Sequence, residues 1–291
     1  MSDETTRNVS IILPAKNEEE GLQKMLPTLR ALIPHAEIIV VDDGSTDNTP
    51  SICAKYNVTV IRHPYSMGNG AAIKSGARAA SGNMLVFLDA DGQHSPDDIP
   101  RLLDKLNEGY DMVVGARHAK THASYGRWYA NIIYNRLASW IVGHDVEDLT
   151  CGFRAVNARK FKEFLHILPN GFSYPTTITM AFFRAGYAVA YMPIQAKTRQ
   201  GKSHINPVRD GVRFFLIIFR VGTLYSPLKV FVPISLLFFI TGLFYYIYTF
   251  ITEHRFTNMS GLLFTTSVVI FLMGLVSEQV TGLLFSRRDN S

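Results

Sequence analysis

Cysteine and tryptophan are almost missing from this chain, whose 291 residues include two of each. Cys53 and Cys151 lie far apart in the sequence and do not have the spacing of metal ligands. Neither a zinc site nor a disulfide framework is therefore indicated. We expect both to be reduced, buried thiols, as in a protein on a cytosolic face.

Charge is scarce in the C-terminal part. Aspartate, glutamate, lysine and arginine make up 18% of the sequence, but most of them precede residue 220. The net charge is +5, and several cations lie where the apolar part begins: Arg209, Arg213, Arg220 and Lys229. Such a placement fits anionic lipid head groups or phosphate ligands and not a basic stripe for nucleic acid. We therefore expect a membrane, and no nucleic acid, as a partner.

Two long apolar segments, at about residues 228–252 and 260–285, dominate the C-terminal part. Each exceeds the ~20 residues needed to cross a hydrocarbon core of ~30 Å, and a short linker joins them, so we predict a transmembrane hairpin. Cations flank its outer ends, which by the positive-inside rule places both termini and the preceding domain in the cytoplasm. Glu278 is costly in lipid, so we expect it to reach the interface or to pair across an oligomer contact.

Residues 208–227 combine arginines with phenylalanines and isoleucines on an amphipathic pattern. Such a segment is typical of helices that lie in the membrane interface, although an ordinary surface helix has the same pattern. The predicted organisation is a cytoplasmic catalytic domain at 1–207, interface helices at 208–227, and the hairpin with a short cytoplasmic tail at 228–291.

Strand-like apolar runs alternate with helical spacing through the N-terminal domain. This alternation predicts an α/β fold with a doubly wound, mainly parallel sheet. The expected strands are residues 9–13, 37–41, 58–61, 84–88, 112–114, 149–156 and 189–192. Helices are expected at 125–142 and 175–185 among others.

Polar residues follow three of these strands. Residues 14–18 follow the first strand, Asp42 and Asp43 the second, and residues 89–94 the fourth, at the edge where open α/β sheets bind ligands. Asp89 and Asp91 lie two apart, so in extended geometry they point the same way and could hold one cation. An Asp-Gly turn that merely ends a strand is the alternative.

Gly68-x-Gly70 lacks the third glycine of a dinucleotide fingerprint and follows the third strand instead of the first. A Rossmann dehydrogenase is therefore not indicated. These glycines instead let the backbone approach a ligand or begin a helix.

Together these motifs resemble family 2 glycosyltransferases with the GT-A fold. The matching residues are Pro14-Ala15-Lys16-Asn17-Glu18, Asp42-Asp43-Gly44-Ser45-x-Asp47 and Asp89-Ala90-Asp91. Three more stretches resemble the polyprenyl-phosphate branch, which includes dolichyl-phosphate mannose synthase and undecaprenyl-phosphate hexose transferases: Asp89-Ala90-Asp91-Gly92-Gln93-His94, Gly115-Ala116-Arg117 and Arg199-x-Gly201-Lys202-Ser203. The resemblance spans about residues 9–225, and the hairpin resembles that of several bacterial members.

The resemblance implies inverting transfer of a hexose from a nucleotide sugar, UDP-linked in preference to GDP-linked, to undecaprenyl or dolichyl phosphate. The implied nucleotide-sugar ligands are Pro14, Ala15, Asn17, Glu18, Asp42, Asp43, Gly70, Asp89 and Ala90. Mg²⁺ or Mn²⁺ would be held by Asp89, Asp91 and Gln93. The acceptor phosphate would meet Arg117, Arg127, Arg136, Arg199, Lys202 and Ser203. Asp91, Arg117 and Arg199 would act directly in catalysis, whereas Arg127 and Arg136 could equally be solvated helix cations.

The chemistry of such an acceptor needs no general base. A lipid monophosphate has a second pKa near ~6 and is largely dianionic at neutral pH, unlike a sugar hydroxyl. Cations that hold it in line with the anomeric carbon are sufficient. His94 and Asp97 are the nearest candidates if a base is required.

Two other functions remain as alternatives. A processive polysaccharide synthase carries Gln-x-x-Arg-Trp, but Gln200 is followed by Gly-Lys-Ser-His, and two spans make a poor tunnel for a polymer. An inactive nucleotide-sugar-binding membrane protein would have a damaged metal motif, yet Asp89, Asp91 and Gln93 are all present. The sequence leaves the sugar open, and a homo-oligomer is compatible with it.

Overall fold

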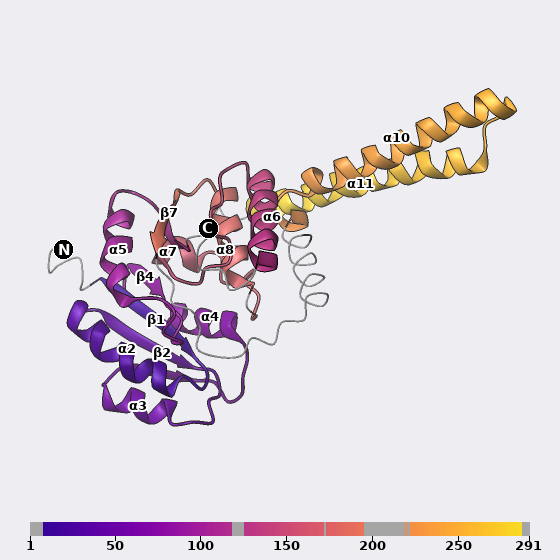
Figure 1. Ribbon diagram of the computed structural model, residues 1–291. Helices are drawn as coiled ribbons and strands as arrows, with labels where there is room; N and C mark the ends of the chain where they lie inside the picture. The colour runs from indigo at the N-terminus through magenta and orange to yellow at the C-terminus, as the bar shows by residue number, and fades with distance from the viewer. Residues whose placement is uncertain (1–7, 118–124, 172, 195–218, 220–221, 287–291) are drawn as a thin grey trace. The chain divides into compact units, whose positions relative to one another are not determined.

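The structure is a computed structural model that describes residues 8–117, 125–171, 173–194, 219 and 222–286. Two compact units make up the chain. The first comprises Met1–Ser139 with His144–His204, and the second comprises Trp140–Gly143 with Ile205–Ser291. The sheet belongs to the first unit and the apolar hairpin to the second (Figure 1).

A seven-stranded sheet in the order β3-β2-β1-β4-β6-β5-β7 forms the centre of the first unit. β1 to β4 are mutually parallel, β5 is parallel to β7, and β6 runs antiparallel to both β4 and β5. The strands are β1 (Val9–Ala15), β2 (Glu37–Asp42), β3 (Thr59–Arg62), β4 (Met84–Phe87), β5 (Met112–Arg117), β6 (Arg154–Asn157) and β7 (Val189–Ile194). The predicted GT-A-type, mainly parallel sheet is confirmed. The strand predicted at 149–156 is wrong in its first half, because residues 149–153 form a loop and β6 begins at Arg154.

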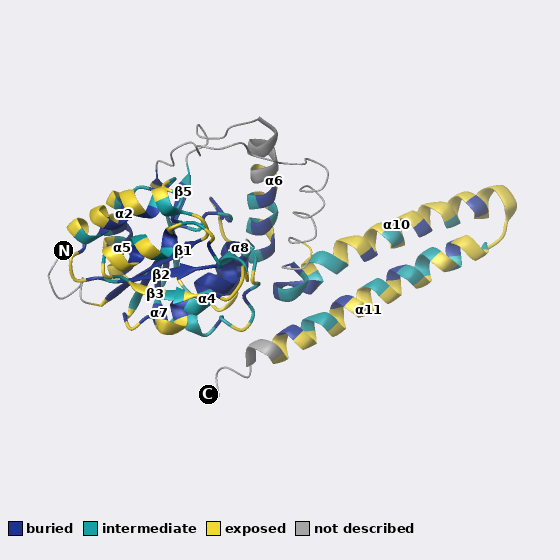
Figure 2. Cartoon of the chain, turned by 90° about the horizontal axis from the view of Figure 1, so that it is seen from below, coloured by how far each residue is buried: buried dark blue, intermediate teal, exposed yellow. Residues whose placement is uncertain are grey.

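Helices connect these strands, and most of them bury one face and expose the other (Figure 2). In α2, the buried residues Leu22, Met25, Leu26 and Leu29 recur at helical spacing, and acidic residues in the first turn suit the positive end of the helix dipole. The helices of this unit are α2 (Glu19–Leu32), α3 (Thr49–Lys55), α4 (Asn69–Ala79), η1 (Pro96–Asp98), α5 (Ile99–Asn107), α6 (Tyr125–Val142), α7 (Ala158–Lys162) and α8 (Tyr174–Arg184).

The carboxyl ends of β1, β2 and β3 lie side by side. Ala15 pairs with Asp42, and Asp42 pairs with Arg62, so the segments that follow these strands begin at the same edge of the sheet. The turn after β4 meets the start of α2 at this edge. A Cβ on Gly21 would lie 2.0 Å from the carbonyl oxygen of Ala90, so only glycine permits this approach.

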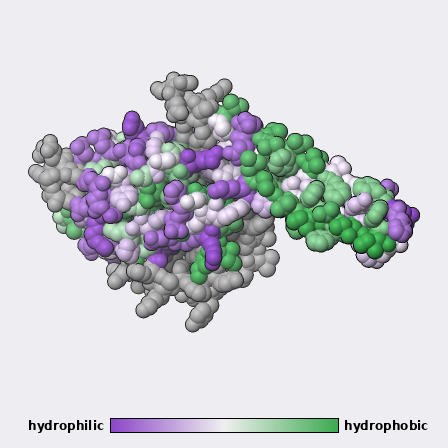
Figure 3. Space-filling model, turned by 90° about the horizontal axis from the view of Figure 1, so that it is seen from above, coloured by the Kyte–Doolittle hydropathy of each residue, from purple (hydrophilic) through white to green (hydrophobic). Residues whose placement is uncertain are grey.

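The hairpin of the second unit consists of α10 (Pro227–Glu253) and α11 (Asn258–Ser286). Both helices are long and apolar enough to span a membrane, and hydrophobic side chains cover most of the hairpin surface seen in Figure 3. The two helices approach closely at small residues. Ser235 and Ser267 each donate a hydrogen bond of 2.9 Å to the other's carbonyl oxygen. The predicted interface segment 208–227 lies mostly outside the described residues.

Glu278 has a partner inside its own hairpin. Its carboxylate accepts a hydrogen bond from the backbone N–H of Leu228 at 3.5 Å, in the first turn of α10. N–H groups in a first helical turn lack partners within the helix and favour a negative charge. The end of α11 therefore caps the beginning of α10.

Candidate functional site

The turn after β4 carries the two carboxylates of the predicted metal site. Gly92 takes a φ of +71°, and Asp91 Oδ1 accepts the N–H of Gln93 at 3.1 Å, which closes the turn. Asn69, the first residue of α4, donates to Asp89 Oδ1 at 3.4 Å. On the other side of this carboxyl group, a Cβ on Gly152 would lie 3.0 Å from Oδ2. Asp89 is thus held between α4 and the loop that precedes β6.

Burial and the negative charge of Asp91 raise the pKa of Asp89 to about 6. Two carboxylates in one turn favour a cation between them. In the described parts of the chain there is no cluster of three histidine, cysteine, aspartate or glutamate side chains, so two carboxylates and an amide are the available set. This set fits Mg²⁺ or Mn²⁺, which commonly take one or two carboxylates together with oxygen atoms of phosphate and water.

Arg117 ends β5 and is held by a residue that the sequence analysis did not identify. Its Nε donates to Asp148 Oδ2 at 2.7 Å, its Nη2 donates to Asp148 Oδ1 at 3.0 Å, and Nη2 also reaches Thr150 Oγ1 at 2.6 Å. Burial alone would lower the pKa of Arg117 and raise that of Asp148. The bidentate ion pair outweighs burial, so the pKa of Arg117 is above, and that of Asp148 below, its ordinary value.

Arg154, also unidentified by sequence, is a fully buried cation at the start of β6. It pairs with Phe87 at the end of β4, two residues before Asp89. Its guanidinium donates to Pro175 O at 3.2 Å, to Thr179 Oγ1 at 3.1 Å and to the carbonyl oxygen of Cys151. Among the described residues, no carboxylate lies within ion-pair distance of Arg154. Burial raises the pKa of Asp89, and the positive charge of Arg154 opposes this increase.

His94 is buried against the ring of Phe153, with 5.3 Å between the ring centroids. Burial and the charge of Arg117 lower the pKa of His94 to about 4, so its imidazole is neutral at pH 7. Its Nδ1 is buried and has no hydrogen bond among the described residues. Asp97, the other candidate base, lies in η1 and accepts a hydrogen bond from Ser95 Oγ at 2.8 Å.

The segment after β1 is bound to the segment after β2. Asn17 has a positive φ of +56°, its N–H donates to Ser45 Oγ at 3.0 Å, and its Oδ1 accepts the N–H of Thr46 at 2.8 Å. The N–H of Glu18 donates to Thr49 Oγ1 at 3.2 Å. Asn17 therefore connects the segment after β1 to the segment after β2. The sequence motif alone did not predict this structural role.

Asp43 has both carboxylate oxygens engaged with the loop after β3. His63 Nδ1 lies 2.7 Å and the N–H of Met67 2.8 Å from Oδ1, while Oδ2 accepts from Ser66 Oγ at 2.8 Å and from Gly68 N at 2.9 Å. Although burial raises the pKa of Asp43, these hydrogen bonds hold it below its ordinary value. Asp43 fixes the loop in place.

Gly70 is required by packing, because a Cβ there would lie 2.1 Å from the carbonyl oxygen of Pro169.

Of the predicted phosphate ligands, Arg117 lies at the site and Arg136 is exposed on α6. The side chains of Arg127, Arg199, Lys202 and Ser203 lie outside the described residues. Pro14 and Ala15 are buried at the end of β1, and Ala90 is buried within the acidic turn.

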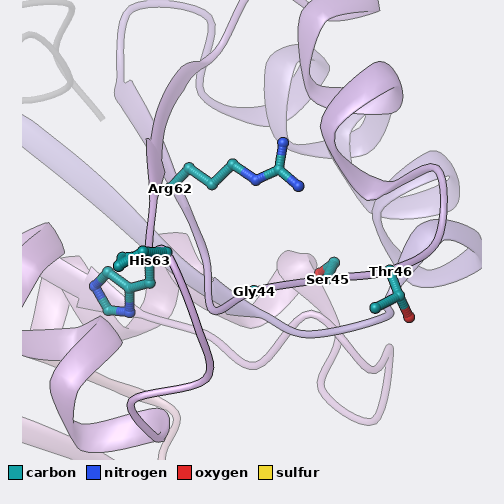
Figure 4. A pocket seen from close by; sticks show the side chains of 6 residues that line it. Gly44, Ser45, Thr46, Arg62 and His63 are labelled. Carbon is teal, nitrogen blue, oxygen red and sulfur yellow. The ribbon is translucent and has the colours of Figure 1, made fainter.

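A hollow of about 460 Å³ lies beside these segments, lined by Gly44, Ser45, Thr46, Arg62, His63 and Pro64 (Figure 4). Asp42 lies in β2 next to it and is fully buried. Oδ1 of Asp42 accepts the N–H of Ser45 at 2.8 Å, whereas Oδ2 has no hydrogen bond among the described residues. Its nearest cation is Arg62, whose Nε lies 3.3 Å from Oδ2 in an ion pair.

Known proteins share both the sheet and the hairpin. The family model for glycosyl transferase family 2 matches residues 10–165, and the model for the GtrB C-terminal hairpin matches residues 226–283. A dolichyl-phosphate hexose transferase of Haloferax volcanii is 30% identical over 227 residues, which are 76% of this chain and 96% of the relative. An undecaprenyl-phosphate 4-deoxy-4-formamido-L-arabinose transferase of Pseudomonas fluorescens is 33% identical over 188 residues, which are 58% of this chain and 55% of the relative.

Among solved structures, a glucosyl-3-phosphoglycerate synthase of Mycobacterium tuberculosis in complex with Mn²⁺ and UDP-glucose has a similar fold. The TM-score is 0.59 at 23% identity, and the match covers 74% of this chain and 80% of that chain. The same synthase in complex with phosphoglyceric acid gives a TM-score of 0.60 at 20% identity, covering 76% of this chain and 81% of that chain. These likenesses confirm the expected fold.

Proposed function

Because the chain belongs to glycosyl transferase family 2, we propose that it transfers a hexose from a nucleotide sugar to a polyprenyl phosphate, with inversion at the anomeric carbon. The preferred donor is UDP-linked, with GDP as the alternative, and the acceptor is undecaprenyl or dolichyl phosphate. The observation that carries this proposal is the acidic turn of Asp89 and Asp91, held at the ligand-binding edge of the sheet by Asn69 and Gly152.

The donor end of the site consists of oxygen ligands. Asp89, Asp91 and Gln93 would hold Mg²⁺ or Mn²⁺, which when bound neutralises the diphosphate of the donor and of the leaving nucleotide. Asn69 orients Asp89 from α4. The buried charge of Arg154 favours the ionised form of Asp89, which is the form that can bind a cation. The complex of a similar fold with Mn²⁺ and UDP-glucose supports this assignment.

The acceptor end needs cations and no base. A phosphate dianion attacks without losing a proton, so the chain has only to hold it in line with the anomeric carbon. Asp148 holds Arg117 in one orientation by two hydrogen bonds, and an oriented guanidinium suits a phosphate. Arg199, Lys202 and Ser203 are proposed as further phosphate ligands, with Arg127 and Arg136 beside them. His94 is neutral and buried, which does not favour it as a base.

The chain is a membrane protein whose α10 and α11 form the anchor. We assign both termini and the domain of residues 1–207 to the cytoplasm, because cations flank the outer ends of the hairpin. Residues 208–227 would lie in the membrane interface, where a lipid phosphate arrives from the bilayer. Residues 228–291 would contribute the two spans and a short tail.

Incubation of the purified full-length protein with labelled nucleotide sugars and Mn²⁺ tests this function. One arm contains polyprenyl phosphate and the other an oligosaccharide, and mass spectrometry identifies the products. We expect a sugar linked to the lipid monophosphate from a UDP-hexose. Sugar polymer in the second arm would indicate a processive synthase, and binding without product in either arm an inactive binding protein.

Asp91→Ala tests the metal assignment, because it removes one of the proposed metal ligands. Asp104→Ala, on the exposed face of α5, is the matched control. Asp91 is one of two carboxylates available for the metal, so its loss should abolish transfer while folding and membrane insertion persist. Asp104→Ala should transfer at the normal rate. Metal-dependent turnover by Asp91→Ala would refute the metal assignment.

A further inference from the structure

A loop without regular structure carries Asp148, the residue that orients Arg117. Residues 144–153 join α6 to β6 and contain neither a helix nor a strand. Asp148 lies in the middle of this loop, and its carboxylate accepts hydrogen bonds from both Nε and Nη2 of Arg117. The direction in which the guanidinium points therefore depends on how firmly the backbone on either side of Asp148 is held.

One side chain of α6 binds the backbone on both sides of Asp148. Nδ2 of Asn135 donates to the carbonyl oxygen of Glu147 at 2.5 Å, and Oδ1 of Asn135 accepts the N–H of Leu149 at 3.2 Å. Leu149 is buried, and a buried N–H group without a partner is costly. Because the side-chain amide carries a donor and an acceptor in one plane, it fixes both peptide groups that flank Asp148 relative to α6.

Further contacts hold α6 and the loop together. The hydroxyl group of Tyr134, a buried residue next to Asn135, lies 2.8 Å from Oγ1 of Thr176 in α8. One turn after Asn135, Oγ of Ser139 accepts the N–H of Val146 at 2.9 Å. The loop therefore has three backbone groups bound by side chains of α6, two of them by Asn135.

We propose that Asn135 is a positioning residue of the transfer reaction, an inference that rests on the proposed function. Asn135 contacts neither substrate and acts through Asp148, which in turn fixes the guanidinium of Arg117 where the acceptor phosphate binds. A guanidinium in one orientation holds a phosphate in line with the anomeric carbon, whereas one that turns freely does so for only part of the time. Asn135 thus governs the use of the acceptor and not the binding of the donor.

A second asparagine of the same domain provides a matched control. Oδ1 of Asn157 accepts the N–H of Lys160 at 3.2 Å as the N-cap of α7. Like Asn135, it satisfies backbone with its side-chain amide, but its bond lies within the first turn of α7. Loss of this cap should lower stability and leave the use of the acceptor unchanged.

Steady-state kinetics of the full-length protein test the inference, with polyprenyl phosphate and nucleotide sugar varied separately. We expect Asn135→Ala to lower kcat/KM for polyprenyl phosphate by about tenfold and to leave KM for the nucleotide sugar unchanged. In an Arg117→Ala background, Asn135→Ala should cause no further loss, because the group through which it acts is gone. Asn157→Ala should transfer at the native rate.

Two kinetic outcomes overturn the inference. Native kinetics of Asn135→Ala would show that the loop holds Arg117 without this amide. An equal loss in the native and Arg117→Ala backgrounds would give Asn135 a merely structural role. If Asn135→Ala does not fold, Asn135→Asp takes its place in the same comparison, because it keeps the acceptor for Leu149 and loses the donor to Glu147.

The Nε–H signal of Arg117 in ¹⁵N spectra measures the positioning without catalysis, and its loss in Arg117→Ala identifies it. Exchange of this proton with water should be about tenfold faster in Asn135→Ala than in the native protein or Asn157→Ala. Faster exchange in a protein that transfers no sugar to lipid would refute the transferase and leave the positioning role intact. Transfer to lipid together with unchanged exchange would refute the positioning role and leave the transferase intact.

Discussion

Gly21→Ala tests whether the acidic turn depends on its contact with α2. A Cβ at this position would lie 2.0 Å from the carbonyl oxygen and 3.1 Å from the carbonyl carbon of Ala90, between the two acidic residues. Ordinary contacts of a Cβ begin at 3.4 Å, so α2 and the turn would have to separate by more than about 1 Å. The obstacle is backbone, which cannot rotate away as the end of a flexible side chain can.

Two effects of this substitution have opposite signs, which makes the test decisive. Helix propensity alone predicts that alanine stabilises α2 by about 1 kcal/mol. Overpacking against the turn predicts a cost of about 1–3 kcal/mol. A shift of about 1 Å in the metal ligands also predicts a loss of about a hundredfold in transfer rate. We therefore expect Gly21→Ala to lower transfer by about that factor without a gain in thermal stability.

Lipid-product formation and thermal unfolding in detergent measure the two quantities. Gly282→Ala is the matched control, since Gly282 also lies in a helix, α11, and a Cβ there meets nothing within 4 Å. It should leave transfer unchanged. If Gly21→Ala transferred sugar at the native rate and melted at a higher temperature, the contact with Ala90 would have no functional role.

Four more expectations concern the charges around the turn. Mn²⁺ binding, measured by calorimetry, should weaken as the pH falls below about 6, where Asp89 takes up a proton. Without metal, the native state holds this proton between the ordinary pKa of 3.8 and about 6, so the free energy of unfolding should decrease as pH rises through that window, and a flat profile would contradict the shift. Asp148→Asn should cost about 2 kcal/mol in unfolding experiments, because it removes the charge opposite the partly exposed Arg117; an unchanged melting temperature would count against the ion pair. Arg154→Met should cost about 2–4 kcal/mol in urea unfolding, because Thr179 and the carbonyl oxygens of Pro175 and Cys151 lose their donor, and Arg154→Lys should recover part of this.

The acidic turn was predictable because its signals are local. The apolar run before it indicates a buried strand, and two carboxylates follow that strand with one residue between them. The extended geometry assumed for them is not present, because Ala90 and Asp91 form a turn. The sequence motifs also located Asp42 at the edge of the sheet. The motifs did not separate ligands from scaffold, since Asn17 and Asp43 turn out to bind neighbouring loops.

The sequence analysis missed Asp148 and Arg154, whose partners lie far from them along the chain. Arg117 and Asp148 are 31 positions apart, and no periodicity connects them. Arg154 stands in a strand that enters antiparallel between β4 and β5, and strand order is a property of the whole sheet. An arginine near apolar residues is ordinarily exposed. Only the sheet order shows that this one is buried beside the end of β4.

The charges around the turn explain why a cation fits there even though arginines are near. Asp89 and Asp91 contribute two negative charges, whereas the positive charge of Arg117 is balanced by its ion pair with Asp148. Arg154 is thus the only neighbouring cation, among the described residues, without a carboxylate partner, and its buried guanidinium is engaged by backbone and hydroxyl oxygens. Its positive charge lowers the pKa of Asp89 and so favours the ionised form of that carboxyl group. With both aspartates ionised, the turn would repel an anionic diphosphate unless a divalent cation offset the charge.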